Sequence, residues 1–136
     1  MKADRVSISN DDRPIFDSLK YSDTPFKGRK NKEIFMMALI LGYYKAGTRT
    51  KLKNPKDYDH VENLGPDRRS IIKAIAVAEE GIDVLNDEEQ IYAIANEYAA
   101  TGIKILDSMV NNHEYDFLKK IESMLVEEYD SKKMGE

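Results

Sequence analysis

Two groups of ionisable side chains are the first candidates for chemistry in this chain. Asp57, Asp59 and His60 lie in one short segment, with Glu62 close behind. Carboxylates and an imidazole at close range can bind a divalent metal ion, but the histidine pair or other fixed spacing that specifies such a site is missing. Glu97 is the second candidate, because it lies in an apolar helical stripe where burial could shift the pKa of its carboxyl group.

Neither group specifies a reaction, and the rest of the sequence supplies no alternative chemistry. The chain has no cysteine, which excludes disulfides, thiolate nucleophiles and cysteine-ligated zinc. It contains no glycine-rich phosphate loop, no metalloprotease motif and no order of residues typical of a catalytic triad. The sequence therefore predicts a protein that is not an enzyme and that binds no cofactor or catalytic metal.

Lysine and arginine form two clusters that flank one apolar segment. Such clusters can grip phosphates without reading bases, and neighbouring tyrosines can add stacking. A helix between the clusters would hold them roughly 20 Å apart, so they can act together only if the following loop folds back. The alternative is that both are simply solvated loops. The predicted contacts to DNA are Lys27, Arg29, Lys30, Lys32, Arg49, Lys51 and Lys53.

Charge divides the 136-residue chain into two halves. Residues 1–69 carry a net charge of +5, residues 70–136 a net charge of −9, and the whole chain −4. A chain of this length suits one domain spanning residues 1–136. We expect two faces with different partners: an acidic helical half that docks a partner protein, and a basic half that makes weak contact with DNA.

The fold is expected to be mainly α, a compact bundle of about five helices around a buried central helix. The central helix is predicted over residues 33–47, because apolar side chains fall on every face and Gly47 is a natural terminal residue. A first helix should end near Tyr21. In the acidic half, Pro66 marks a helix start, Asn86 caps the next helix, and Leu118, Ile121 and Leu125 define the last one.

Two segments are expected to be extended or irregular. Polar and apolar side chains alternate over Arg5–Ser9, which predicts a short N-terminal strand or extended arm. Thr48–Leu64 has no helical periodicity, contains Pro55, and is the longest irregular stretch, with room for a short strand near Arg49–Leu52. Long loops in compact domains tend to be functional or mobile.

A strand followed by two helices also suggests an alternative, a ribbon-helix-helix transcriptional regulator. In that case two copies would pair their Arg5–Ser9 strands to enter the major groove, and the protein would be an obligate dimer. The central helix is too apolar for that small dimer unless the later helices cover it. Small residues such as Ala95, Ala99 and Gly102 fit close internal packing of helices, or a seam between two copies, so a homodimer stays open.

The chain is expected to be cytoplasmic and to make no contact with a membrane. Its longest uninterrupted apolar run, Ile34–Leu41, has eight residues, whereas a membrane-spanning helix needs about 20. The first five residues lead into no apolar stretch of the kind that a signal peptide requires.

Several blocks of the sequence resemble one family. Residues 76–81, 85–89 and 96–106, together with the apolar block 32–43 that closes on glycine and tyrosine, look like the small proteins encoded beside DNA phosphorothioation (Dnd) genes. The resemblance covers roughly residues 30–106. It implies a bacterial or archaeal intracellular accessory protein of DNA modification or restriction. None of the blocks is a catalytic motif, so the resemblance transfers no active-site residue.

Overall fold

The structure is a computed structural model that describes residues 3–112. In chain order its elements are β1 (Arg5–Ser9), the 3-10 turn η1 (Asn10–Asp12), α1 (Arg13–Tyr21), α2 (Asn31–Ile40), the π-helical turn η2 (Leu41–Ala46), β2 (Pro55–His60), α3 (Val61–Glu80), the 3-10 turn η3 (Ile82–Asn86) and α4 (Glu88–Asn111). The predicted mainly α class is confirmed. Four of the expected helices lie in this range, and the one predicted around Leu118 to Leu125 falls outside the described residues.

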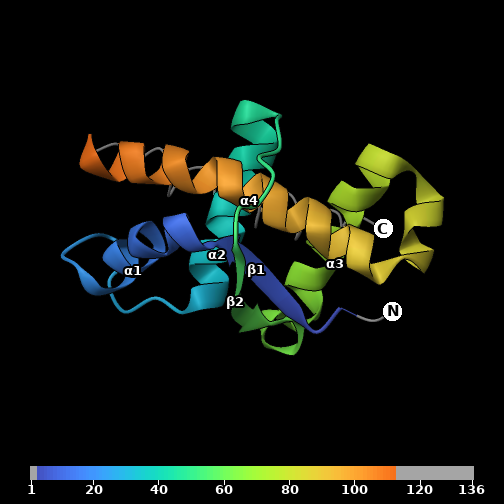
Figure 1. Cartoon of the computed structure of the whole chain (residues 1–136), viewed down its shortest axis with the longest axis horizontal. Helices are drawn as coiled ribbons and strands as arrows, with labels where there is room; N and C mark the ends of the chain where they lie inside the picture. The colour runs from blue at the N-terminus through green and yellow to red at the C-terminus, as the bar shows by residue number, and fades with distance from the viewer. Residues whose placement is uncertain (1–2, 113–136) are drawn as a thin grey trace, which may run out of the picture.

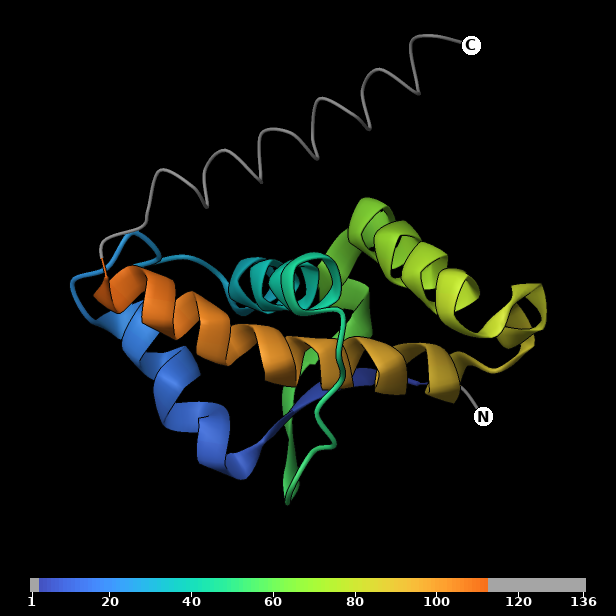
Figure 2. The same ribbon diagram turned by 90° about the horizontal axis from the view of Figure 1, so that it is seen from above.

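Helix α4 lies between two layers. Figures 1 and 2 show α2 and α3 on one side of α4, and β1, β2 and α1 on the other. One hydrophobic core joins these layers and includes side chains from Val6 to Val110. The centre of the fold is therefore shared between α4 and the predicted central helix.

The predicted central helix is α2 continued by η2. All residues from Ile34 to Gly42 are buried, as the apolar residues on every face indicated. The Lys30 N–H donates to Glu33 Oε1 (3.3 Å) at the first turn. At the other end Gly47 has φ +67°, a left-handed conformation that favours glycine, and its N–H donates to the Gly42 carbonyl (2.9 Å). The end at Gly47 was predicted correctly, but the widened π turn before it was not.

Two glycines allow α2–η2 to cross α4 in backbone contact. A Cβ on Gly42 would overlap the Tyr98 carbonyl group and lie 3.1 Å from the Gly102 nitrogen. A Cβ on Gly102 would overlap the Ala38 carbonyl group and lie 2.7 Å from the Gly42 nitrogen. Ala95 and Ala99 are buried in the same helix. The small residues of α4 thus serve internal packing, the first of the two roles that the sequence left open.

The N-terminal strand forms a two-stranded antiparallel sheet within the chain. β1 pairs with β2 from Arg5 opposite His60 to Ser9 opposite Pro55, with a bulge between Val6 and Ser7. The prediction of a strand near residues 49–52 is wrong, because the second strand begins only at Pro55. The prediction of irregular chain as far as residue 64 is also wrong, because α3 begins at Val61.

This pairing argues against the ribbon-helix-helix alternative. A ribbon made by two copies needs a free β1 edge, but one edge of β1 pairs with β2 of the same chain. On the other side, the Ser7 N–H donates to Asn96 Oδ1 of α4 (3.1 Å). Both edges of β1 therefore make hydrogen bonds inside the molecule. The strand is not free to pair with β1 of a second copy and form a ribbon that enters the major groove.

Helix boundaries in the acidic half follow the sequence closely, with one shift. The chain is non-helical at Gly65 (φ +82°), so a new helical segment within α3 begins at Pro66, as predicted. The cap of α4 is Asp87 instead of Asn86, since Asp87 Oδ1 accepts the Gln90 N–H (3.2 Å). Of the helices formed by residues 3–112, none is long and apolar enough to cross a membrane.

Candidate functional site

The first basic segment, residues 27–32, lies in the connection between α1 and α2. Lys27, Arg29 and Lys30 are exposed, and Lys32 is half-buried in the first turn of α2. Arg29 Nη1 donates to Glu33 Oε2 (2.9 Å). Burial opposes ionisation of Glu33, but the Lys30 N–H and the Arg29 guanidinium outweigh it, so the pKa of Glu33 lies below its usual range. Arg29 is therefore partly neutralised by its neighbour.

The second basic segment, residues 48–54, runs back across α4. The Thr50 N–H donates to the Glu97 carbonyl (3.1 Å), and the hydroxyls of Thr50 and Thr101 are 2.7 Å apart. Further along, the Lys53 N–H donates to Ser9 Oγ (3.0 Å). Figure 2 shows this segment leaving η2 on the α2 side of α4 and crossing α4 to reach β2 on the other side. We call its exposed cations the α4 strip: Arg49, Lys51 and Lys53.

Glu97 forms an ion pair in this strip. Arg49 Nε lies 3.6 Å from Glu97 Oε1, and both side chains are about one-third exposed (32% and 29%). The sequence singled out Glu97 as the best candidate for acid–base chemistry, but in the structure its carboxylate faces the Arg49 guanidinium and not a second carboxylate. Glu97 therefore limits the positive charge of the strip.

The two basic segments do not form one surface. The chain does fold back, since Asn31 Nδ2 at the start of α2 donates to the Tyr58 carbonyl of β2 (3.1 Å). In Figures 1 and 2, however, residues 27–32 stay beside α1 and α2, while residues 48–54 cross α4 on their way from η2 to β2. Within residues 3–112, no ion pair involves Lys27, Lys30, Lys32, Lys51 or Lys53. The seven predicted DNA contacts thus divide between two segments, and among the described residues only Arg29 and Arg49 of the seven form ion pairs.

The segment with Asp57, Asp59 and His60 is held together by arginine and asparagine. Arg5 Nε lies 3.6 Å from Asp57 Oδ2, and the Arg5 guanidinium also contacts the His60 ring. Asp59 Oδ1 accepts the His60 N–H and the Asn63 amide, each at 2.8 Å. No group of three or more histidines and carboxylates in the described part of the chain is arranged to hold a metal ion.

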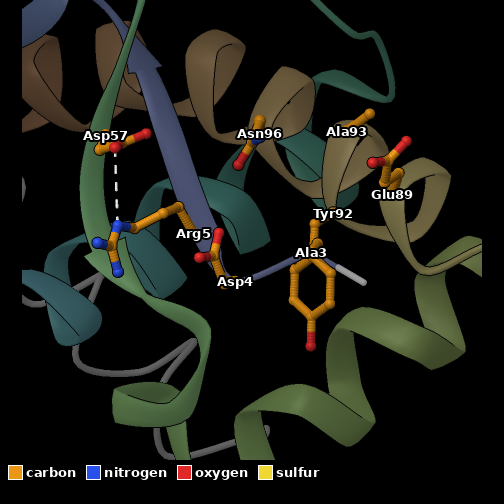
Figure 3. Close-up of a pocket in the computed structure, with 8 residues that line it drawn as sticks. All are labelled: Ala3, Asp4, Arg5, Asp57, Glu89, Tyr92, Ala93 and Asn96. Carbon is orange, nitrogen blue, oxygen red and sulfur yellow. Dashed lines mark ion pairs between the residues drawn. The ribbon is translucent and has the colours of Figure 1, made fainter. Parts of the chain in front are cut away.

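A recess of about 450 Å³ opens between the start of β1, the middle of β2 and the first turns of α4. Figure 3 shows Asp57 and Glu89 at opposite ends of the recess, with the Asn96 amide between them. Asp57 faces Arg5, and Asn96 is already bonded to β1. The recess therefore keeps Asp57 and Glu89 apart. Its lining residues are Ala3, Asp4, Arg5, Asp57, Glu89, Tyr92, Ala93 and Asn96.

The turn between α3 and α4 forms a third feature, which we call the acidic tip. Ile82 and Leu85 of η3 are 66% and 45% exposed, while Val84 between them is buried and anchors the turn. Residues 78–90 contain no lysine or arginine. Figure 1 shows this yellow-green turn at one end of the molecule, away from residues 48–54. Its carboxylates are Glu79, Glu80, Asp83, Asp87, Glu88 and Glu89.

Comparison with known proteins places the chain in a family. The family model described as "DNA sulphur modification system-associated protein 4" matches residues 5–136, nearly the whole chain. The chain belongs to this family. Membership in this family confirms the resemblance drawn from residues 30–106 and extends it to residues 5–136. No curated protein and no solved structure matches the chain.

Sequence reasoning found the charged residues of this family member but missed what positions them. Arg5, Asn96 and Thr50 hold β1, β2 and the α4 strip in place, and their partners lie 51 to 89 residues away in the chain. No local signal in the sequence reports contacts at that separation. The exposure of Ile82 and Leu85 was also missed, because their spacing does not distinguish a buried turn from an open one.

Proposed function

We propose that this protein is a non-enzymatic adaptor of a DNA sulphur modification system, which contacts DNA on one surface and a partner protein on another. The family supports the accessory role. The observation that carries the adaptor proposal is the placement of two surfaces of opposite charge, the α4 strip and the acidic tip, on different parts of the molecule. A protein that acts on DNA in a prokaryote works beside the chromosome, so the proposal includes a cytoplasmic location.

DNA contact is assigned first to the α4 strip. Lys51 and Lys53 are exposed and form no ion pair within residues 3–112. Their backbone is fixed to α4 and β1 through Thr50 and Lys53, so the cations are held on a rigid surface. Residues 27–32 form a second, weaker contact surface, because Arg29 is committed to Glu33. Both patches would bind phosphates without reading sequence.

Salt dependence of binding to generic duplex DNA tests this assignment. We expect the full chain to bind at about 50 mM salt and to lose affinity steeply as salt rises, because counterions are released from the DNA. Lys51→Gln and Lys53→Gln should each weaken binding and flatten the salt slope, whereas Lys73→Gln on the exposed side of α3 should change little. No binding at about 50 mM salt, or an affinity independent of salt, would remove the DNA role.

The acidic tip is the proposed docking site for the partner protein. Two exposed apolar side chains, Ile82 and Leu85, are surrounded by carboxylates that no basic residue of the turn neutralises. Such a surface fits a partner segment that presents apolar anchors flanked by lysine or arginine, since interface cores are apolar and complementary charge steers association. A second copy of the chain would bring two acidic tips together, and their charges would repel each other.

Binding to purified proteins of the same DNA sulphur modification system tests the docking site. We expect one of them to co-elute with the full chain in size-exclusion chromatography. Ile82→Ser combined with Leu85→Ser should abolish the complex, and Tyr21→Ser, which also removes an exposed hydrophobic side chain, should leave it intact. A complex that survives the double substitution would place the interface elsewhere.

A further inference from the structure

Near the end of η2, an exposed tyrosine shortly precedes the α4 strip in the chain. Tyr44 is 65% exposed, and it precedes the first cation of the strip, Arg49, by five residues. Figure 1 shows α2 and η2 rising past α4 before the chain turns back across it. Tyr43 is half-buried and Tyr58 is buried, so Tyr44 is the most exposed of these three tyrosines.

A chain of edge-to-face contacts holds this ring in place. The Tyr44 and Tyr43 ring centroids are 4.9 Å apart at 82°, and those of Tyr43 and Tyr98 are 5.2 Å apart at 88°. Tyr98 is 2% exposed and donates its hydroxyl to Glu79 on α3. Edge-to-face contact restrains a ring, and the fold thereby presents the Tyr44 ring as a fixed platform.

The same part of α4 anchors both the ring and the cations. Tyr98, which supports Tyr43, follows Glu97 in the chain, and Glu97 pairs with Arg49 and accepts the Thr50 N–H. The left-handed Gly47 turns the chain from the tyrosines into the strip within a few residues. The tyrosine pair and the first cation of the strip are therefore supported by two consecutive residues of α4, Tyr98 and Glu97.

We propose that Tyr44 and the α4 strip together bind single-stranded DNA. An unpaired base would stack on the Tyr44 ring, and the phosphates that follow would lie along Arg49, Lys51 and Lys53. Aromatic side chains combined with a basic track are the general means of binding single strands, because every base has a face that can stack. In a duplex the bases are already stacked on each other, so Tyr44 would add nothing there. This inference rests on the proposed DNA contact and specifies the form of DNA.

Fluorescence anisotropy with two labelled probes tests the inference, an oligothymidylate of about 16 nucleotides and a duplex of the same length. We expect Tyr44→Ala in the full chain to weaken oligothymidylate binding about tenfold without changing its salt slope, and to leave duplex binding unchanged. Tyr44→Phe keeps the ring and should bind like the unsubstituted protein. Tyr21→Ala is the matched control, because Tyr21 is 68% exposed but lies at the end of α1.

The possible outcomes separate this inference from the proposed function. If Tyr44→Ala binds oligothymidylate normally, or weakens both probes equally, the stacking role is overturned. In a second outcome, Lys51→Gln and Lys53→Gln lose duplex binding while Tyr44→Ala binds both probes normally. That result would support the proposed DNA contact and overturn only the preference for single strands. If neither probe binds at about 50 mM salt, both the inference and the DNA role fail.

Discussion

Gly42 and Gly102 face each other where α2–η2 crosses α4, and each would place a Cβ within about 3 Å of the other's backbone nitrogen (3.1 and 2.7 Å). This contact fixes how the two most buried helices pack. It also sets the position of everything that follows η2, including the turn at Gly47 and the α4 strip. A small change at this crossing should therefore affect the whole fold.

Gly102→Ala is expected to destabilise the protein. Helix propensity alone predicts a gain of about 1 kcal/mol for alanine over glycine in a helix interior. The new Cβ would instead collide with the Ala38 carbonyl group, which belongs to a helix backbone and cannot rotate away. We expect a net loss of about 3 kcal/mol in the free energy of unfolding, measured by urea denaturation.

Gly28→Ala is the comparison for that substitution. Gly28 has φ +78°, but nothing lies within 4 Å of its Cβ position. The strain of a left-handed alanine should cost only about 1 kcal/mol. If Gly102→Ala proves neutral or stabilising, the backbone contact between the two helices is wrong.

Tyr98→Phe should weaken the attachment of α3 to α4. The Tyr98 hydroxyl donates to Glu79, and burial together with this carboxylate raises the pKa of Tyr98 to about 12. Because the pKa is raised above the ordinary value of 10, the stability that Tyr98 contributes is complete below pH 10 and lost as the pH rises toward 12. We expect Tyr98→Phe to cost about 1 kcal/mol at neutral pH.

The pH dependence provides a second readout for Tyr98. Unfolding followed between pH 9 and 12 should show a shallower decline in stability for Tyr98→Phe than for the unsubstituted protein. Part of the decline in stability should remain in Tyr98→Phe, because burial also raises the pKa of the Tyr58 and Tyr92 phenols. An unchanged slope would contradict the role given to the Tyr98 hydroxyl.

Tyr58→Phe is expected to have the opposite effect. Tyr58 is buried against Phe16, and its hydroxyl finds no hydrogen-bonding partner in the described part of the chain. Removing a buried polar group that has no partner stabilises a protein by about 1 kcal/mol. Thermal unfolding of Tyr58→Phe should therefore occur at a higher temperature than that of the unsubstituted protein, whereas a lower temperature would reveal a partner for this hydroxyl.

Glu97→Gln should strengthen binding to DNA. Arg49 is paired with Glu97 across 3.6 Å, and the substitution would free its charge for a phosphate. We expect a several-fold gain in duplex affinity and a salt slope that is steeper by about one unit. The free energy of unfolding should change by less than about 1 kcal/mol, because ion pairs that remain partly exposed to solvent contribute little. Weaker binding after the substitution would show that Glu97 supports the strip instead of limiting it.

The sequence predicted most of the helices because their signals are local. Apolar side chains on every face indicated α2, and Gly47 and Pro66 mark an end and a start that the structure keeps. The second strand was misplaced because Pro55 and alternating charges at the start of β2 are not typical of a strand. It forms because β1 supplies a partner, and that pairing is visible only in three dimensions.

The candidate site was harder to predict than the fold. Exposed lysines could be named from the sequence. Their division between two segments depends on the path that residues 48–54 take across α4, which the sequence does not indicate. The pairing of Glu97 with Arg49 and the fixed ring of Tyr44 follow from contacts between residues about 50 positions apart, such as Thr50 with Thr101. Such contacts leave no periodic pattern in the sequence.

The central claim is that the α4 strip, and not the acidic tip, is the surface that meets DNA. Amide chemical shifts of the full chain, followed by NMR while duplex DNA is added, test it most directly. We predict shifts for residues 49–53 and for Thr101 beside them, with residues 79–89 unchanged. Shifts that cluster at the tip around Ile82, or that spread evenly over the molecule, would contradict the account.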